Sequence, residues 1–102
     1  MLVAELDGRP TSYAVVDVRE RADNWRILGD RYADLESIAV LPEARGRGIG
    51  TALMREVYGR LRALRVREIK TQVVIGNEEA RRFYEREGLR PWTINYLGPV
   101  PD

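Results

Sequence analysis

The sequence contains no cysteine and no histidine. Without cysteine, disulfides, thiol nucleophiles and thiolate metal sites are excluded. Without histidine, the chain has no imidazole that could act as a general base or bind zinc. Acid–base chemistry in this chain must therefore use aspartate, glutamate, tyrosine, lysine or water, and the sequence predicts no metal site.

Long apolar runs and an excess of one charge are also absent. No apolar stretch approaches the roughly 18 residues that a membrane-spanning helix needs, and we expect the first residues not to act as a signal peptide. The 17 basic and 16 acidic residues give a formal net charge of +1. This near balance gives no reason to expect nucleic acid or membrane partners. Because neither a membrane-spanning run nor a signal peptide is predicted, we expect a cytoplasmic protein.

The length and the apolar pattern indicate one small domain over residues 1–102. The predicted order is β-β-β-α-β-α-β. Strands are predicted at 2–6, 13–19, 31–40, 66–75 and 92–97, and helices at 49–65 and between Asn77 and Gly88. Asn77 is the expected N-cap of the second helix, and Gly88 is expected to end it. Antiparallel strands followed by strand–helix–strand crossovers indicate an α+β domain with a mixed sheet.

A glycine-rich stretch, Arg45-Gly46-Arg47-Gly48-Ile49-Gly50-Thr51, separates a β-branched strand from the first predicted helix. A turn of this kind gathers backbone N–H groups and the positive end of a helix dipole at one point, where phosphate binds well. A flexible turn without a ligand explains this stretch alone about equally well. The P-loop is disfavoured because no lysine follows Gly50, and the dinucleotide fingerprint because position 51 is not glycine.

Two segments together resemble one enzyme family. The spacing Arg45-x-x-Gly48-x-Gly50 resembles the acyl-CoA pyrophosphate loop of the GNAT superfamily of N-acetyltransferases. The later segment Asn77-x-x-Ala80-x-x-Phe83-Tyr84-x-x-x-Gly88-Leu89 resembles that family's second CoA-facing helix. The resemblance covers roughly residues 35–90. It implies a GNAT-like mixed β-sheet with two main helices, and acetyl-CoA as the acyl donor without a metal.

The resemblance also implies which residues hold the donor. The loop N–H groups would bind the pyrophosphate, with the side chains of Arg45 and Arg47 adding charge-assisted bonds. The backbone of Ile38 to Val40 would pair with pantetheine, and the N–H near Val40 would stabilise the oxyanion. The acetyl-CoA contacts implied in full are Ile38, Ala39, Val40, Arg45, Gly46, Arg47, Gly48, Ile49, Gly50, Thr51, Asn77, Ala80, Phe83 and Tyr84.

Three side chains are candidates for acid–base catalysis. Tyr84 is the candidate general acid, since a phenol keeps its proton at neutral pH. Helical spacing alone favours a core aromatic paired with Phe83, and it is the resemblance of the segment from Asn77 to Gly88 that favours catalysis. Asp34 and Glu36 stand two positions apart on one strand, so both face the same side. Either could be the general base, although a solvated strand face or a water base fits as well.

The resemblance has one clear departure. The family fold normally begins with another strand and one or two helices that line the acceptor pocket, whereas this sequence begins at what corresponds to the second strand. An open sheet edge would favour pairing with another chain, so a homodimer is a reasonable hypothesis. The resemblance implies an N-acetyltransferase acting on a primary amine of a small molecule or protein. The alternative is a non-catalytic module that binds acyl-CoA or a partner.

Overall fold

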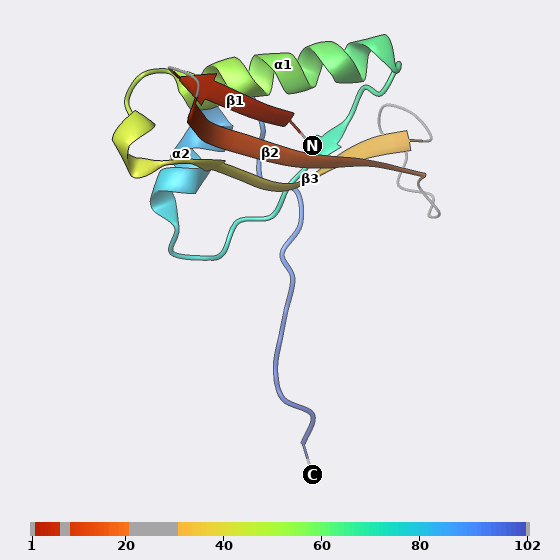
Figure 1. The fold of residues 1–102 in the computed structure, drawn as a ribbon. Helices are drawn as coiled ribbons and strands as arrows, with labels where there is room; N and C mark the ends of the chain where they lie inside the picture. Colours follow the sequence, from red (N-terminus) through yellow and green to blue (C-terminus); the bar gives the residue numbers. More distant parts are fainter. Residues whose placement is uncertain (1, 7–8, 21–30, 102) are drawn as a thin grey trace. The chain divides into compact units, whose positions relative to one another are not determined.

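The computed structural model describes residues 2–6, 9–20 and 31–101 (Figure 1). The elements in chain order are β1 (Leu2–Leu6), β2 (Arg9–Glu20), β3 (Arg31–Val40), the 3-10 turn η1 (Pro42–Ala44), α1 (Ile49–Ala63), β4 (Ile69–Lys70) and α2 (Glu78–Arg86). The chain divides into two compact units, Met1–Gln72 and Val73–Asp102, and each is described by itself. None of the described helices is long and apolar enough to cross a membrane.

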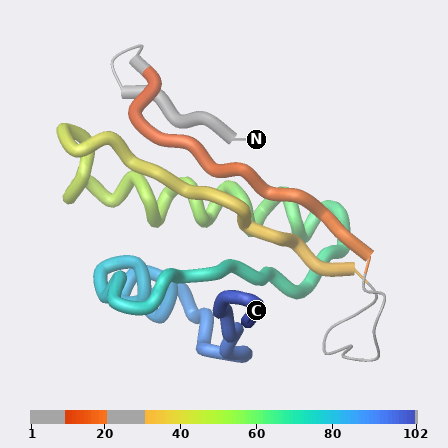
Figure 2. The backbone as a smooth tube through the Cα atoms, turned by 90° about the horizontal axis from the view of Figure 1, so that it is seen from below, coloured from red at the N-terminus to blue at the C-terminus, as the bar shows by residue number. Residues whose placement is uncertain are grey.

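The first unit is a mixed sheet with one helix along it. The strand order is β1-β2-β3-β4. The first three strands pair antiparallel and β4 joins β3 in parallel. Helix α1 contacts β1, β2 and β3 and lies across one face of the sheet (Figure 2). This arrangement agrees with the α+β class and the mixed sheet that the sequence predicts.

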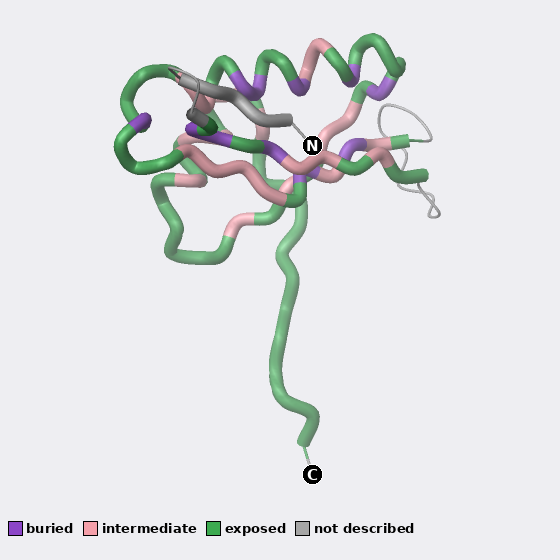
Figure 3. Tube along the Cα trace, in the orientation of Figure 1, coloured by how far each residue is buried: buried purple, intermediate pink, exposed green. Residues whose placement is uncertain are grey.

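An apolar stripe on α1 builds the core of this unit. Its buried residues are Leu53, Met54, Val57 and Leu61. They recur at the three- and four-residue spacing that places side chains on one helix face. The sheet contributes the buried side chains of Ala14, Ala33 and Leu35, and Figure 3 shows buried positions along both α1 and the strands. This packing fixes the N-terminal end of α1 relative to β3.

A β-bulge interrupts β3 in its middle. Val16 pairs with Leu35 and Val15 pairs with Ser37, so Glu36 is an extra residue on β3. A bulge of this kind shifts the alternation of the strand by one position. Ile38 accordingly pairs with the buried Ala14 and shares its side of the sheet.

Strand β4 is much shorter than the predicted strand 66–75. Only Ile69 and Lys70 pair with β3, opposite Ala33 and Asp34. The side-chain hydroxyl of Thr71 then donates to the carbonyl of Leu35 at 3.0 Å, where a longer strand would continue the backbone ladder. The strand predicted from the composition of 66–75 is therefore too long, because the side-chain bond of Thr71 takes the place of further backbone pairing.

The second unit contains α2, whose ends match the predicted signals. The side chain of Asn77 accepts a hydrogen bond from the N–H of Ala80 at 3.2 Å, which is the expected N-cap. Gly88 has a φ of +97°, and the N–H of Leu89 donates to the carbonyl of Tyr84 at 3.0 Å. These contacts form the glycine-terminated helix end that the sequence predicts.

The predicted last strand over residues 92–97 is wrong. The structure has no strand there, so the element order ends at α2. Trp92, Ile94 and Tyr96 are 67%, 79% and 93% exposed. Strand preference depends on packing against neighbouring strands, and no described segment pairs with these residues. Their alternating apolar pattern alone does not make a strand.

Replacing Ser12 with alanine is expected to stabilise the protein. Ser12 is 5% exposed, and its hydroxyl has no hydrogen-bond partner among the described residues. A buried hydroxyl without a partner is unfavourable by about 1 kcal/mol or more, so Ser12→Ala should raise the melting temperature by roughly 4–8 °C. Ser37→Ala is the control, since the Ser37 hydroxyl lies 3.4 Å from that of Tyr13. A lower melting temperature for Ser12→Ala would contradict the expectation.

Candidate functional site

The glycine-rich loop links β3 to α1 through two left-handed residues. Gly46 has a φ of +79° and Gly48 a φ of +72°, a region that glycine enters without strain. Before them, the N–H of Ala44 donates to the carbonyl of Leu41 at 2.9 Å, and the buried Ala44 side chain anchors the turn. The loop therefore requires glycine at two of the predicted positions.

The same loop leaves open space in front of the helix N-terminus. Apart from the adjoining residues, no atom of the described part of the chain lies within 4 Å of where a Cβ would stand on Gly46 or Gly48. Gly48 is the N-cap of α1 and supplies no side-chain bond, and the first turn carries no acidic residue. The first helical bond runs from the N–H of Ala52 to the carbonyl of Gly48. The N–H groups of the first turn are thus directed at an open point, which fits a phosphate group.

The two loop arginines differ in their surroundings. The Nε of Arg45 donates to the carbonyl of Val40 at 3.2 Å, so its side chain ties the loop to the end of β3. Arg47 is exposed. The structure thus gives Arg45 a structural contact that the sequence did not indicate, and the predicted bonds from both arginines to pyrophosphate stay a prediction.

The end of β3 presents backbone groups at an unpaired edge. The N–H of Leu41 donates to the carbonyl of Thr11 at 2.7 Å, on the side of β2. Because successive residues of a strand alternate in hydrogen-bonding direction, the N–H groups of Ile38 and Val40 point to the other edge. Strand β4 pairs with β3 only as far as Asp34. This edge can therefore pair with an extended, amide-containing ligand.

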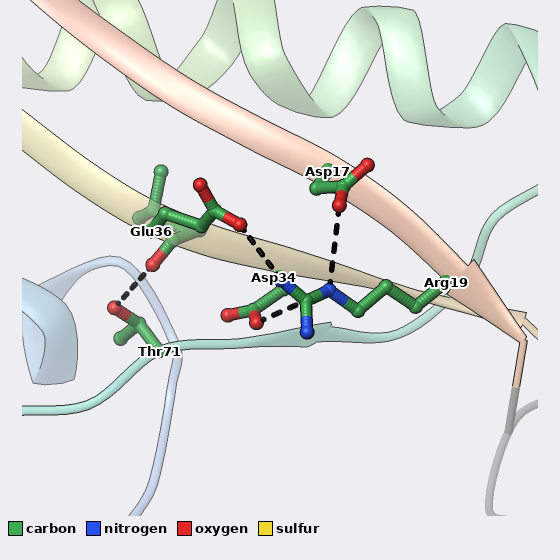
Figure 4. A network of polar contacts seen from close by, with 6 residues as sticks. Asp17, Arg19, Asp34, Glu36 and Thr71 are labelled. Carbon is green, nitrogen blue, oxygen red and sulfur yellow. Dashed lines mark hydrogen bonds and ion pairs between the residues drawn. The ribbon is translucent and has the colours of Figure 1, made fainter. Parts of the chain in front are cut away.

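Three carboxylates surround the guanidinium of Arg19 (Figure 4). Its Nη2 donates to Glu36 at 2.8 Å, and its Nε lies 3.6 Å from Asp34 and 3.4 Å from Asp17. The structure thus brings the two predicted carboxylates, Asp34 and Glu36, together at one cation. Sequence analysis missed Arg19 and Asp17, because their place depends on the register that sets Asp17 opposite Asp34.

Among the described residues, the cluster around Arg19 has more negative than positive charge. The hydrogen bond to Glu36 raises the pKa of Arg19 above its ordinary value, so this guanidinium stays charged. The side chain of Glu36 is 41% exposed and that of Asp34 is 19% exposed. Among the described residues, no carboxylate cluster is arranged to hold a metal ion. An exposed surface with three carboxylates and one guanidinium attracts small cations such as protonated amines.

Four candidate residues lie in the second unit. Phe83 and Tyr84 pack edge to face, with ring centroids 5.4 Å apart and an angle of 67° between the planes. Both are half-buried, as is Ala80. The side chain of Asn77 is used by the helix cap. The structure thus shows the aromatic pairing and the cap, while contacts of these four residues with acetyl-CoA stay predictions.

The sequence matches the model of the acetyltransferase (GNAT) family over residues 1–89. It is 35% identical over 94 residues to an uncharacterised N-acetyltransferase of Archaeoglobus fulgidus. It is 36% identical over 91 residues to an uncharacterised N-acetyltransferase of Methanocaldococcus jannaschii. These matches cover 88% and 85% of this chain but 59% and 37% of the relatives. The chain thus spans about half the length of these two relatives.

The fold is shared with solved acetyltransferases. The structure is similar to that of an aminoglycoside N-acetyltransferase in complex with CoA, with a TM-score of 0.80. The similarity covers 96% of this chain and 74% of that protein at 23% sequence identity. An identity this low supports the fold alone, and it confirms the predicted α+β class.

Proposed function

The chain belongs to the GNAT family of acetyltransferases, and from this membership we propose that it transfers an acetyl group from acetyl-CoA to a primary amine. The amine belongs to a small molecule or a protein. The observation that carries the proposal is the open point formed by Gly46, Gly48 and the uncapped first turn of α1, placed next to the unpaired edge of β3.

The loop and the β3 edge fit two successive parts of acetyl-CoA. The N–H groups between Arg45 and Thr51 hold the pyrophosphate, with the dipole of α1 favouring its charge. The N–H groups of Ile38 and Val40 pair with the amides of the pantetheine arm. The complex of a protein of the same fold with CoA supports this assignment.

Acetyl-CoA supplies an activated thioester, and the chain supplies the groups that move protons and stabilise charge. The N–H near Val40 donates to the carbonyl oxygen as negative charge develops there. The new bond joins the amine nitrogen to the acetyl carbon, and the carbon–sulfur bond breaks. Tyr84 gives its proton to the departing thiolate, and the amine loses its proton to a carboxylate or to water.

The Arg19 cluster supports a role for Asp34 or Glu36 as the base. A protonated amine entering this negatively charged surface competes with Arg19 for the carboxylates. Glu36 is the more accessible of the two, with 41% of its side chain exposed against 19% for Asp34. Glu36 is therefore the better placed to take a proton from the amine directly, and Asp34 through a water molecule.

Acetyl-CoA is expected to raise the melting temperature of the protein strongly. A ligand present at 100 times its dissociation constant stabilises by about 2.7 kcal/mol, which for a chain of this size is roughly 10 °C or more. A differential scanning measurement with acetyl-CoA, and with ATP and dephospho-CoA as controls, checks this. No shift in a protein that melts cooperatively would contradict the proposed donor site.

Turnover is measured separately by following CoA release with a panel of amines. Release with an amine but not without one supports the acetyltransferase. A strong thermal shift without release from any amine would instead favour the alternative, a module that binds acyl-CoA without turnover.

A further inference from the structure

A cavity of about 420 Å³ lies where α1 ends and β4 begins. Its lining residues all fall between positions 58 and 69, so it lies entirely within the first unit. The 15 residues of α1 extend over about 22 Å, and the glycine-rich loop is at the opposite end of the helix (Figure 1). The volume is within the range of small-molecule sites, and this position separates the cavity from the proposed donor site.

The lining combines an apolar base with three cations, one carboxylate (Glu68) and the side chain of Tyr58. Leu61 and Val66 are 6% and 4% exposed, and they line the cavity together with the exposed side chains of Arg62, Arg65 and Arg67. In the part of the chain that the structure describes, no carboxylate forms an ion pair with these three arginines. The three arginines outnumber the carboxylate of Glu68, so the lining has a net positive charge beside apolar surface.

The helix end does not need these three side chains as caps. The N–H of Val66 donates to the carbonyl of Leu61 at 2.9 Å, and that of Arg65 to the carbonyl of Arg62 at 3.0 Å. The guanidinium of Arg31 donates to the carbonyl of Leu64 at 2.6 Å. Backbone groups and a residue outside the cavity thus satisfy these carbonyls at the C-terminal end of α1.

Arg65 has an unfavourable backbone conformation. Its φ is +59°, and it is the only non-glycine residue with positive φ among the described residues. Glycine is the usual residue at this position after a helix, and a side chain there strains the backbone. A cation therefore stands beside the cavity at a position where glycine would make the fold more stable. Strained residues of this kind cluster at binding sites.

We propose that this cavity binds a small organic phosphate with an apolar or aromatic body. The phosphate oxygens accept charge-assisted hydrogen bonds from the guanidinium groups of Arg62, Arg65 and Arg67. The apolar body covers Leu61 and Val66. The site is independent of acetyl transfer and of the glycine-rich loop.

Phenyl phosphate is the probe, and the amide resonances of residues 61–69 report its binding by NMR at constant ionic strength. Arg62→Ala is expected to lower the affinity at least tenfold. Arg55→Ala removes the same charge from the same helix, but Arg55 is exposed and outside the lining, so this control is expected to change the affinity less than twofold. Equal affinities for the two variants, or no saturable shift at these amides, would overturn the proposal.

Arg65→Gly separates binding from folding. It removes a guanidinium and a strained backbone conformation together, so the melting temperature should rise while the affinity for phenyl phosphate falls. A rise in both would show that Arg65 takes no part in binding. Inorganic phosphate and benzoate complete the test. If inorganic phosphate bound as tightly as phenyl phosphate, the claim that the site recognises an apolar body would be overturned. If benzoate bound as tightly as phenyl phosphate, the claim that the site prefers phosphate would be overturned.

Discussion

Gly48→Val is expected to abolish the stabilisation of the protein by acetyl-CoA. Gly48 has a φ of +72°, which a β-branched residue adopts only with strain. The valine side chain would also occupy the open space in front of the first turn of α1, which is the proposed site of the pyrophosphate. The free protein should lose about 1–2 kcal/mol of stability. The thermal shift of roughly 10 °C with acetyl-CoA should disappear, as a ligand titration followed by melting will show.

Gly59→Ala is the matched control for that variant. Gly59 lies within α1, has no positive φ, and a Cβ there would meet only the end of the Arg62 side chain at 3.7 Å. Alanine should therefore stabilise the helix by about 1 kcal/mol and leave the response to acetyl-CoA intact. If Gly48→Val retained the affinity of the unchanged protein for acetyl-CoA, the loop would not be the pyrophosphate site.

Tyr84→Phe is expected to reduce the rate of acetyl transfer by about 10²-fold, the lower end of what general acid catalysis contributes. The substitution removes only the hydroxyl, so the edge-to-face contact of the ring with Phe83 and the helix end should persist. The dissociation constant for acetyl-CoA should therefore change little. Steady-state rates with saturating acetyl-CoA, compared with the thermal shift, separate the two effects.

Tyr96→Phe provides the comparison for the Tyr84 variant. Tyr96 is 93% exposed, so loss of its hydroxyl should affect neither rate nor stability. Equal rates for Tyr84→Phe and the unchanged protein would remove Tyr84 from the mechanism. A parallel loss of acetyl-CoA affinity would instead give the hydroxyl a binding role.

The features predicted correctly from the sequence are those that depend on neighbouring residues. The turn at Gly46 and Gly48, the Asn77 cap and the glycine at the end of α2 follow from the conformations that single residue types allow. Three of the four buried residues on α1, Leu53, Val57 and Leu61, follow from helical spacing. The mixed sheet follows from the order of the elements, since a helix between two strands favours parallel pairing.

The features that depend on distant partners were missed or wrong. The predicted strand 92–97 has the right composition but no partner among the described residues, and the strand predicted over 66–75 ends where Thr71 bonds to Leu35. The place of Arg19 beside Glu36 depends on the pairing register of β2 with β3. Spacing within one segment carries no information about any of these contacts.

The bulge at Glu36 makes the number of residues in β3 as important as their identity. Ile38 and Val40 pair with Ala14 and Ser12, so their side chains share the α1 side of the sheet while their N–H groups point to the open edge. One added or removed residue in this strand therefore reverses the hydrogen-bonding direction of each later backbone group. Chemically similar side chains can replace one another along this stretch without moving the N–H groups of Ile38 and Val40, whereas loss of a single residue would direct those groups toward β2.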